Sequence, residues 1–453
     1  MTTIWAERAL LPEGWAENVL VTVAGDGRIA SVETGAEPAG RRTGLLLPAL
    51  ANLHSHAFQR AMAGLSEAKG DLPTDSFWTW RKIMYRFLDH LTPEDVETIA
   101  ALVQMEMLEA GYATNVEFHY LHHRPGGAHY DDIAEMSARI AAAAERTGIG
   151  LTLLPVHYQF GGCDGRALGP GQQRFGTDPD EFARPVQGAE SAIAALPDAG
   201  IGIAPHSLRA VSREALAICA DLRPDRPLHL HIAEQIPEVD EVQAAYGQRP
   251  VAWLLDHADV SRRWTLIHAT QMNDDETRRL AATGAVAGLC PITESSLGDG
   301  IFNGTVWTDA QGRYGYGSDS NIRISLTEEL RTLEHSQRLR DRGRAVLATR
   351  AKSTGRVLYE AGLDGGATAA GRDTGAIRTG LYADLCAVSL KNSVMAGRRG
   401  DEMLDSLIFA GHDGLIDDVW SAGRHVVRDG YHIDHDRITA DYIDCIERLQ
   451  DRM

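Results

Sequence analysis

Cysteine is scarce in this chain and is never closely spaced. The 453 residues include five cysteines, and no two of them form a Cys-x-x-Cys pair. They are Cys163, Cys219, Cys290, Cys386 and Cys445. This spacing argues against a disulfide framework and against a zinc site built from cysteine.

Long apolar runs are also missing. No run approaches the roughly 20 residues that a helix needs to cross a bilayer. The N-terminal residues 1–7 lack the basic and then apolar layout of a signal peptide. We therefore expect a cytoplasmic protein that does not bind membranes.

Positive charge is in short supply. The chain has 44 Lys and Arg residues against 63 Asp and Glu residues, which gives a net charge of −19. Such a field disfavours nucleic acids and anionic membranes as partners. A small anionic substrate would need a local cluster of arginines to overcome this repulsion.

What the middle of the chain does contain is an alternation of apolar strand-like runs with helical segments. The candidate strands are Leu45–Ala51, Thr114–Phe118, Gly150–Val156, Gly202–Pro205, Leu228–Ile232, Thr265–Ile267, Ala285–Leu289 and Tyr316–Ser318. Helices are expected over Glu94–Ala110, Ile133–Arg146, Ser191–Leu196 and Thr327–Arg340. The alternation predicts an α/β fold, a (β/α)8 TIM-like barrel, with a doubly wound open sheet as the alternative.

Both ends of the chain are typical of short strands joined by glycine turns. The strands are expected at Val19–Val23, Ile29–Val32, Leu385–Val388, Ile416–Ser421 and His425–Val427. We predict that residues 1–48 and 370–453 form one small β-sandwich domain built from both termini. Residues 49–369 would form the barrel, and the glycine-rich residues 362–375 a loop between the two domains.

Metal-ligating side chains stand at the ends of several predicted strands, where barrel enzymes place their active groups. His54 and His56 are two apart after the first strand, so both project to one face and can reach one point. A histidine of the fifth strand and Asp319 after the eighth would complete a set of three imidazoles and one carboxylate. Such a set holds a zinc-like ion and leaves a position for water.

The fifth strand offers two histidines on the same face, His229 and His231. We favour His231 as the ligand, because Glu234 would then lie at the edge of the metal. His268 follows the sixth strand. Taken singly, His268 could be structural and Asp319 a turn residue; their placement at strand ends favours a functional site.

The combination resembles the amidohydrolase superfamily, in its mononuclear branch. It rests on His54-x-His56, His231-x-x-Glu234, His268 and Asp319, and it covers the whole chain. No lysine is suitably placed after the fourth strand to bridge two metals, so we expect one divalent ion, Zn²⁺. The resemblance implies that Asp319 also accepts a proton from water, that Glu234 carries protons to the substrate nitrogen, and that His268 polarises the intermediate. It also implies a homodimer.

Five stretches carry a closer resemblance within that family. They are Asn52–Arg60, Phe77–Arg81, Glu117–Tyr120, Ala204–Arg209 and Cys290–Gly300. They resemble the members that hydrolyse the C=N bond of N-formimino-L-glutamate in bacterial histidine degradation. The implied products are N-formyl-L-glutamate and ammonia.

The residues suit a dicarboxylate substrate, because the arginine fork binds carboxylates bidentately. We expect Arg81, Arg209 and Tyr120, in loops on the catalytic face, to hold the carboxylates. Gln59 and His206 would lie beside the reacting group.

Two other functions compete with this interpretation. A deaminase of purines, pyrimidines or triazines would act on flat, uncharged rings that do not require paired arginines. A non-catalytic scaffold would be expected to have lost at least one of the site residues. The histidines at 119, 122 and 123 lie in one loop without a carboxylate partner, so we do not expect a second metal there.

Overall fold

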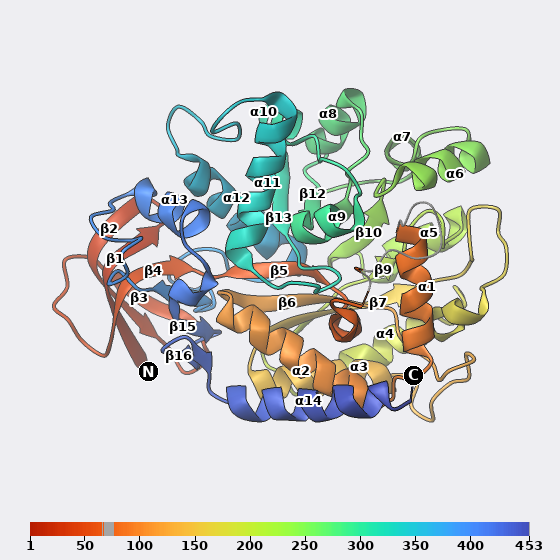
Figure 1. Cartoon of the computed structure of the whole chain (residues 1–453), viewed down its shortest axis with the longest axis horizontal. Coiled ribbons are helices and arrows are strands. Elements are labelled where there is room, and N and C mark those ends of the chain that lie inside the picture. Colours follow the sequence, from red (N-terminus) through yellow and green to blue (C-terminus); the bar gives the residue numbers. More distant parts are fainter. Residues whose placement is uncertain (66, 68–76, 453) are drawn as a thin grey trace.

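Eight parallel strand positions form a closed ring in the computed structural model, which describes residues 1–65, 67 and 77–452. Figure 1 shows strands of this ring with helices around them. The strands in order are β5 (Leu50–Ser55), β6 (Tyr112–His119), β7 (Gly150–His157), the pair β8 (Gly200–Ile201) and β9 (Ala204–Pro205), β10 (Leu228–Ile232), β11 (Trp264–His268), β12 (Val286–Leu289) and β13 (Arg313–Tyr316). Parallel bridges Ser55–Asp319 and Ile203–Leu228 join the two arcs of this ring. The predicted barrel is confirmed and the open sheet is wrong.

Helices surround the ring, most of them in the connections between strands. They are α1 (Phe77–Leu88), α2 (Pro93–Glu109), α3 (Glu135–Thr147), α4 (Ala183–Ile193), α5 (Arg213–Leu222), α6 (Ile236–Tyr246), α7 (Pro250–His257), α8 (Asp274–Ala282), α9 (Pro291–Leu297), α10 (Gly304–Asp309), α11 (Leu326–Asp341) and α12 (Thr354–Ala370). The local sequence determines where helix α2 starts, because Thr92 and Asp95 form a capping box there. None of the helices among the described residues is both long and apolar enough to span a membrane.

Both termini contribute to a single eight-stranded sheet beside the barrel. The N-terminal strands are β1 (Thr2–Leu11), β2 (Gly14–Val23), β3 (Ile29–Glu33) and β4 (Arg41–Pro48), and the C-terminal ones are β14 (Leu385–Val388), β15 (Ile416–Ser421), β16 (Arg424–Arg428) and β17 (Tyr431–His432). The two groups meet where β4 pairs antiparallel with β14. A sheet built from both ends is thus confirmed; the domain boundaries stay a prediction.

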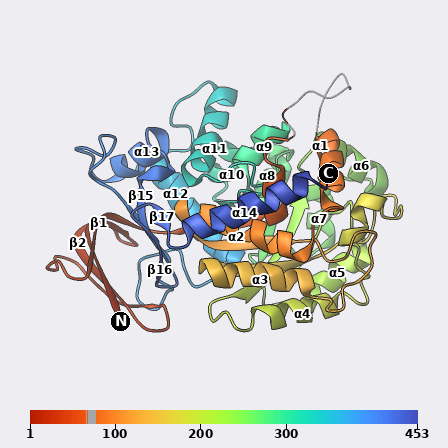
Figure 2. The ribbon, with the colours of Figure 1, turned by 60° about the horizontal axis from the view of Figure 1, so that its bottom comes forward.

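Two further helices follow β14. They are α13 (Asp401–Phe409) and α14 (His435–Gln450). The last helix does not stay with the terminal sheet but lies along α2 of the barrel (Figure 2). Asp95 at the start of α2 accepts hydrogen bonds from the Cys445 thiol at 3.4 Å and from Arg452 at 2.8 Å. The C-terminal residues 435–452 therefore pack against the barrel through α2.

The predicted first strand is wrong in its bounds. Residues 45–48 belong to β4 of the terminal sheet, and the barrel strand begins at Leu50. Between them the Ala49 N–H donates to Asp384 O at 2.9 Å, at the point where the chain passes from sheet to barrel. One continuous apolar run serves both strands, so the hydrophobic pattern conceals the boundary.

The eighth strand also begins earlier than predicted, at Arg313 instead of Tyr316. Its polar and glycine-containing sequence weakens the strand pattern there. The glycine-containing strand β13 packs against a helix that also contains glycine. Residues 362–370, predicted as a loop, form the second half of α12, which packs on β13 and β5. A Cβ at Gly365 would lie 2.0 Å from Tyr314 O, and one at Gly362 would lie 2.6 Å from a Leu50 methyl. Glycine is needed there for close packing.

This packing predicts a clear stability difference between two glycine variants. Gly365→Ala should lower the free energy of unfolding by about 1–3 kcal/mol, because the added carbon collides with a backbone carbonyl. Gly25→Ala is the control, since nothing lies within 4 Å of its added Cβ. Urea unfolding of both variants measures the effect, and equal stability would contradict the packing argument.

Candidate active site

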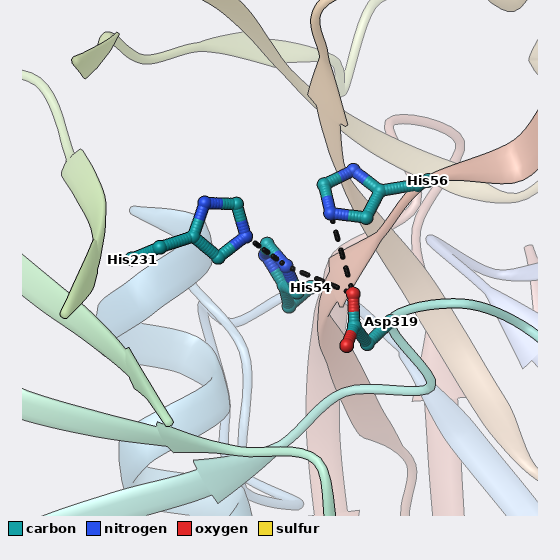
Figure 3. Close-up of side chains that lie close together, drawn as sticks. All are labelled: His54, His56, His231 and Asp319. Carbon is teal, nitrogen blue, oxygen red and sulfur yellow. Dashed lines mark hydrogen bonds and ion pairs between the residues drawn. The ribbon is translucent and has the colours of Figure 1, made fainter. Parts of the chain in front are cut away.

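Three histidines and one aspartate meet at the carboxyl ends of the barrel strands (Figure 3). Asp319 Oδ1 lies 3.4 Å from His54 Nε2 and 3.3 Å from His56 Nε2. His231 Nε2 lies 3.0 Å from His54 Nε2. The four ligand atoms lie within 4.8 Å of one another, and all four residues are buried. The sequence predicted this set as the metal site.

Barrel closure places Asp319 against the histidine pair. The Asp319 N–H donates to His54 O at 2.9 Å, and the His56 N–H donates to Asp319 O at 2.9 Å. Asp319 has a φ of +47°, a left-handed conformation that is uncommon for a residue with a side chain. The two backbone bonds hold the residue there and aim its carboxylate at the imidazoles.

The donor atoms fit a bound cation. His56 Nδ1 lies 3.0 Å from Phe118 O, and His231 Nδ1 lies 3.1 Å from His206 O. A carbonyl oxygen only accepts, so each Nδ1 carries the proton and each neutral ring turns the lone pair of Nε2 to the centre. Burial lowers the pKa of both rings and so favours the neutral form. Two imidazole lone pairs that converge beside a carboxylate form an arrangement that a bound cation stabilises.

His229, the alternative ligand, lies outside this cluster. Its Nε2 donates to Ala369 O in α12 at 2.9 Å. Residues 229 and 231 share a face of β10, but His229 lies one layer closer to the N-terminal end of the barrel. The preference for His231 is therefore confirmed by the geometry of the cluster.

His268 links the cluster to a group of buried carboxyls. Its Nε2 lies 3.7 Å from Glu234 Oε1 and 3.9 Å from Asp319 Oδ2, and its Nδ1 lies 3.3 Å from Glu294 Oε1. Burial alone would lower the pKa of His268, but Glu234 and the other two carboxylates raise it well above its ordinary value. Burial also raises the pKa of Glu234 to about 7. A carboxyl group with that pKa can both hold and release a proton at neutral pH.

The predicted substrate residues all line one cavity with the metal cluster. Its walls include Gln59, Arg81, Tyr120, His206 and Arg209, together with His56, His231, Glu234, His268 and Asp319. Tyr120 and Arg209 follow their strands in loops as expected. Arg81 was expected in a loop but lies in helix α1, within the long connection from β5 to β6. The aromatic sequence at residues 77–81 does not indicate where helix α1 begins.

Sequence reasoning missed several lining residues. They are Trp80, Met84, Tyr85, Tyr158, Phe175, Leu297 and Ser320. It also missed Glu294, which accepts from the Cys290 N–H at 2.9 Å as well as facing His268. A carboxylate five residues past the seventh strand was a usable signal for Glu294. The sequence contains no comparable signal for the aromatic lining residues, because aromatic side chains are equally typical of a hydrophobic core.

Comparison with known proteins agrees with this geometry. Residues 45–426 match the amidohydrolase family. This chain belongs to that family. Residues 1–42 match the N-terminal domain of the formimidoylglutamate deiminase HutF. The resemblance inferred from the motifs of this amidohydrolase is thus confirmed.

Three relatives of this amidohydrolase illustrate the range of similarity. Formimidoylglutamate deiminase of Pseudomonas aeruginosa is 46% identical, with 100% of each chain covered. An amidohydrolase structure from Brucella melitensis has a TM-score of 0.95 at 46% identity and covers 99% of this chain and 100% of its own. An adenosine deaminase from Xanthomonas campestris with bound zinc has a TM-score of 0.82 at 24% identity, over 100% of this chain and 98% of its own. The last of these shows the fold alone.

The cluster predicts different outcomes for the two histidines of β10. The variant His231→Ala should lose most bound metal, because one of four ligands is removed. The variant His229→Asn should keep the wild-type metal content, since residue 229 faces Ala369 and not the cluster. Elemental analysis of the purified variants makes the comparison. Metal loss in the residue 229 variant alone would reverse the ligand assignment.

Proposed function

We propose that the protein hydrolyses the C=N bond of the formimino group of N-formimino-L-glutamate. The products are N-formyl-L-glutamate and ammonia, and the protein is a formimidoylglutamate deiminase. One observation carries the proposal: two arginines, Arg81 and Arg209, line the same cavity as a buried histidine and aspartate cluster. In a chain of net charge −19, such arginines favour a substrate with carboxylates.

The proposed cofactor is one Zn²⁺ ion held by His54, His56, His231 and Asp319. Imidazole nitrogens and a carboxylate oxygen form a donor set that suits this ion. When bound, the ion supplies Lewis-acid chemistry that makes water nucleophilic near neutral pH. We also propose that the enzyme is a cytoplasmic homodimer, as the family resemblance implies.

Proton transfers fall to three side chains in this proposal. Asp319 takes a proton from the attacking water. Burial would raise the pKa of this carboxyl, but the contact with His54 brings it below the ordinary value. His268, held between carboxylates, stabilises charge on the oxygen that adds to the carbon. Glu234 delivers protons to the nitrogen. The C–O bond forms, the bond to nitrogen breaks, and both water protons leave on ammonia.

The rest of the cavity positions the substrate. Arg81, Arg209 and Tyr120 are proposed to bind the two carboxylates. Gln59 donates to the Tyr120 hydroxyl at 2.6 Å, and the Tyr120 ring lies 4.7 Å from that of His56. His206 lies 4.9 Å from His231 between ring centroids. Gln59 and His206 are therefore well placed to contact the formimino group.

An ammonia-release assay tests the proposed function. The substrates are N-formimino-L-glutamate, guanine, cytosine and S-adenosylhomocysteine, each with and without a chelator. We expect release from the first compound only, with loss of activity after chelation and recovery on addition of Zn²⁺. Turnover of one of the ring compounds in its place would overturn the proposal.

The paired arginines predict a large effect of Arg209→Met on substrate affinity. This variant keeps an unbranched apolar stem and removes the guanidinium, so KM for N-formimino-L-glutamate should rise about 10- to 100-fold, the range for a hydrogen bond to a charged group. Arg428→Met, at an exposed position in β16, is the matched control and should leave KM unchanged. Steady-state kinetics of both variants decides, and an unaltered KM in the first would contradict the assignment.

A further inference from the structure

Tyr158 lies in the cavity, one aromatic ring away from the metal cluster. It follows β7 directly and is buried. Its ring centroid lies 4.5 Å from that of His206, which in turn lies 4.9 Å from His231. The phenol of Tyr158 therefore faces the part of the cavity that would contain a substrate held at the metal.

Both acceptor positions of the Tyr158 oxygen are occupied by protein donors. Gln172 Nε2 donates to it at 2.9 Å and an Arg81 terminal nitrogen at 3.2 Å. The orientation of the Gln172 amide is fixed, because its Oε1 accepts from the Gly169 N–H at 2.9 Å. A tyrosine hydroxyl accepts two hydrogen bonds and donates one. The Tyr158 proton must therefore go to a third partner.

Within the described part of the chain, Tyr158 donates to no acceptor. A buried hydroxyl proton without an acceptor is costly, so a site of this kind is built for a ligand that accepts. The hydroxyl also lies against the positive guanidinium of Arg81, and the charge of Arg209 is close enough to interact with it. A ligand group that accepts from a hydroxyl beside two cations is an anion.

Arg81 itself is held in place by two phenols. Its Nε donates to the Tyr85 hydroxyl, and its terminal nitrogen donates to that of Tyr158. These bonds fix the plane of the guanidinium before a ligand arrives. A preorganised fork loses less conformational entropy on binding than a mobile one.

We propose that Tyr158 is a specificity-determining residue, whose hydroxyl donates to a substrate carboxylate that Arg81 also contacts. This inference rests on the proposed function, since it assigns a binding role within the same cavity. A carboxylate oxygen accepts from the hydroxyl and from the guanidinium together. A neutral amide or an aromatic ring at the same place gains much less from that pair. Tyr158 thereby selects for a dicarboxylate.

The test compares Tyr158→Phe with wild type on three substrates. They are N-formimino-L-glutamate, N-formimino-4-aminobutyrate, which lacks the α-carboxylate, and N-formimino-L-2-aminobutyrate, which lacks the side-chain carboxylate. The variant should lower kcat/KM for the dicarboxylate about 10- to 100-fold, mainly through KM. For whichever analogue lacks the carboxylate that Tyr158 binds, wild type and variant should perform alike.

Controls separate this outcome from loss of structure. Tyr112→Phe removes a buried hydroxyl outside the cavity that has no hydrogen-bond partner among the described residues, and it should leave all three substrates unaffected. Thermal unfolding and metal content of the Tyr158 variant should match wild type.

Two results would overturn the inference. An equal loss on all three substrates would mean that the hydroxyl supports the cavity as a whole and does not act through a substrate carboxylate. No loss on the dicarboxylate would mean that the hydroxyl does not contact the substrate. Failure of the wild-type protein to release ammonia from N-formimino-L-glutamate is a different result, which refutes the proposed function itself.

Discussion

The parallel bridge between Ser55 and Asp319 is the contact on which the rest of the site depends. It closes the barrel between its first and last strands, and the same backbone bonds place Asp319 beside His54 and His56. Without this closure, the ligands of β5 and β13 would lie at opposite edges of an open sheet. Closing the fold and assembling the metal site are one structural event.

The groups that surround the metal ligands also follow from the barrel fold. Backbone carbonyls that follow from strand geometry, Phe118 O and His206 O, set the tautomers of two ligand imidazoles. Burial then separates the protonation behaviour of neighbouring groups: the pKa of His54 falls to about 3, whereas that of Glu234 rises to about 7. A hydrophobic barrel interior thus keeps the ligands neutral and leaves one carboxyl able to exchange protons.

Sequence alone predicted the barrel and the cluster because both depend on local patterns. The strands that carry His54 and His231, β5 and β10, have clear apolar runs, and the spacing of His54 and His56 fixes a shared face. The boundary at Ala49 could not be predicted, since apolar residues continue across it into another sheet. Helix α12 was missed because Gly362 and Gly365 look like loop residues until β13 is known to pack on them. The aromatic residues that line the cavity, including Tyr158, are brought together by tertiary contacts, which the periodicity of the sequence cannot predict.

The order of strands in the terminal sheet has a consequence for synthesis of the chain. Strand β4, which leads directly into the first barrel strand, lies between β1 and β14. Its second neighbour is made only when residues 385–388 leave the ribosome. Until then, one edge of β4 stays open and the segment that carries the first two metal ligands is anchored on one side only. Contacts this distant in sequence are slow to form. The nascent chain therefore passes through an interval in which one edge of β4 is exposed, and such an edge can pair with another chain.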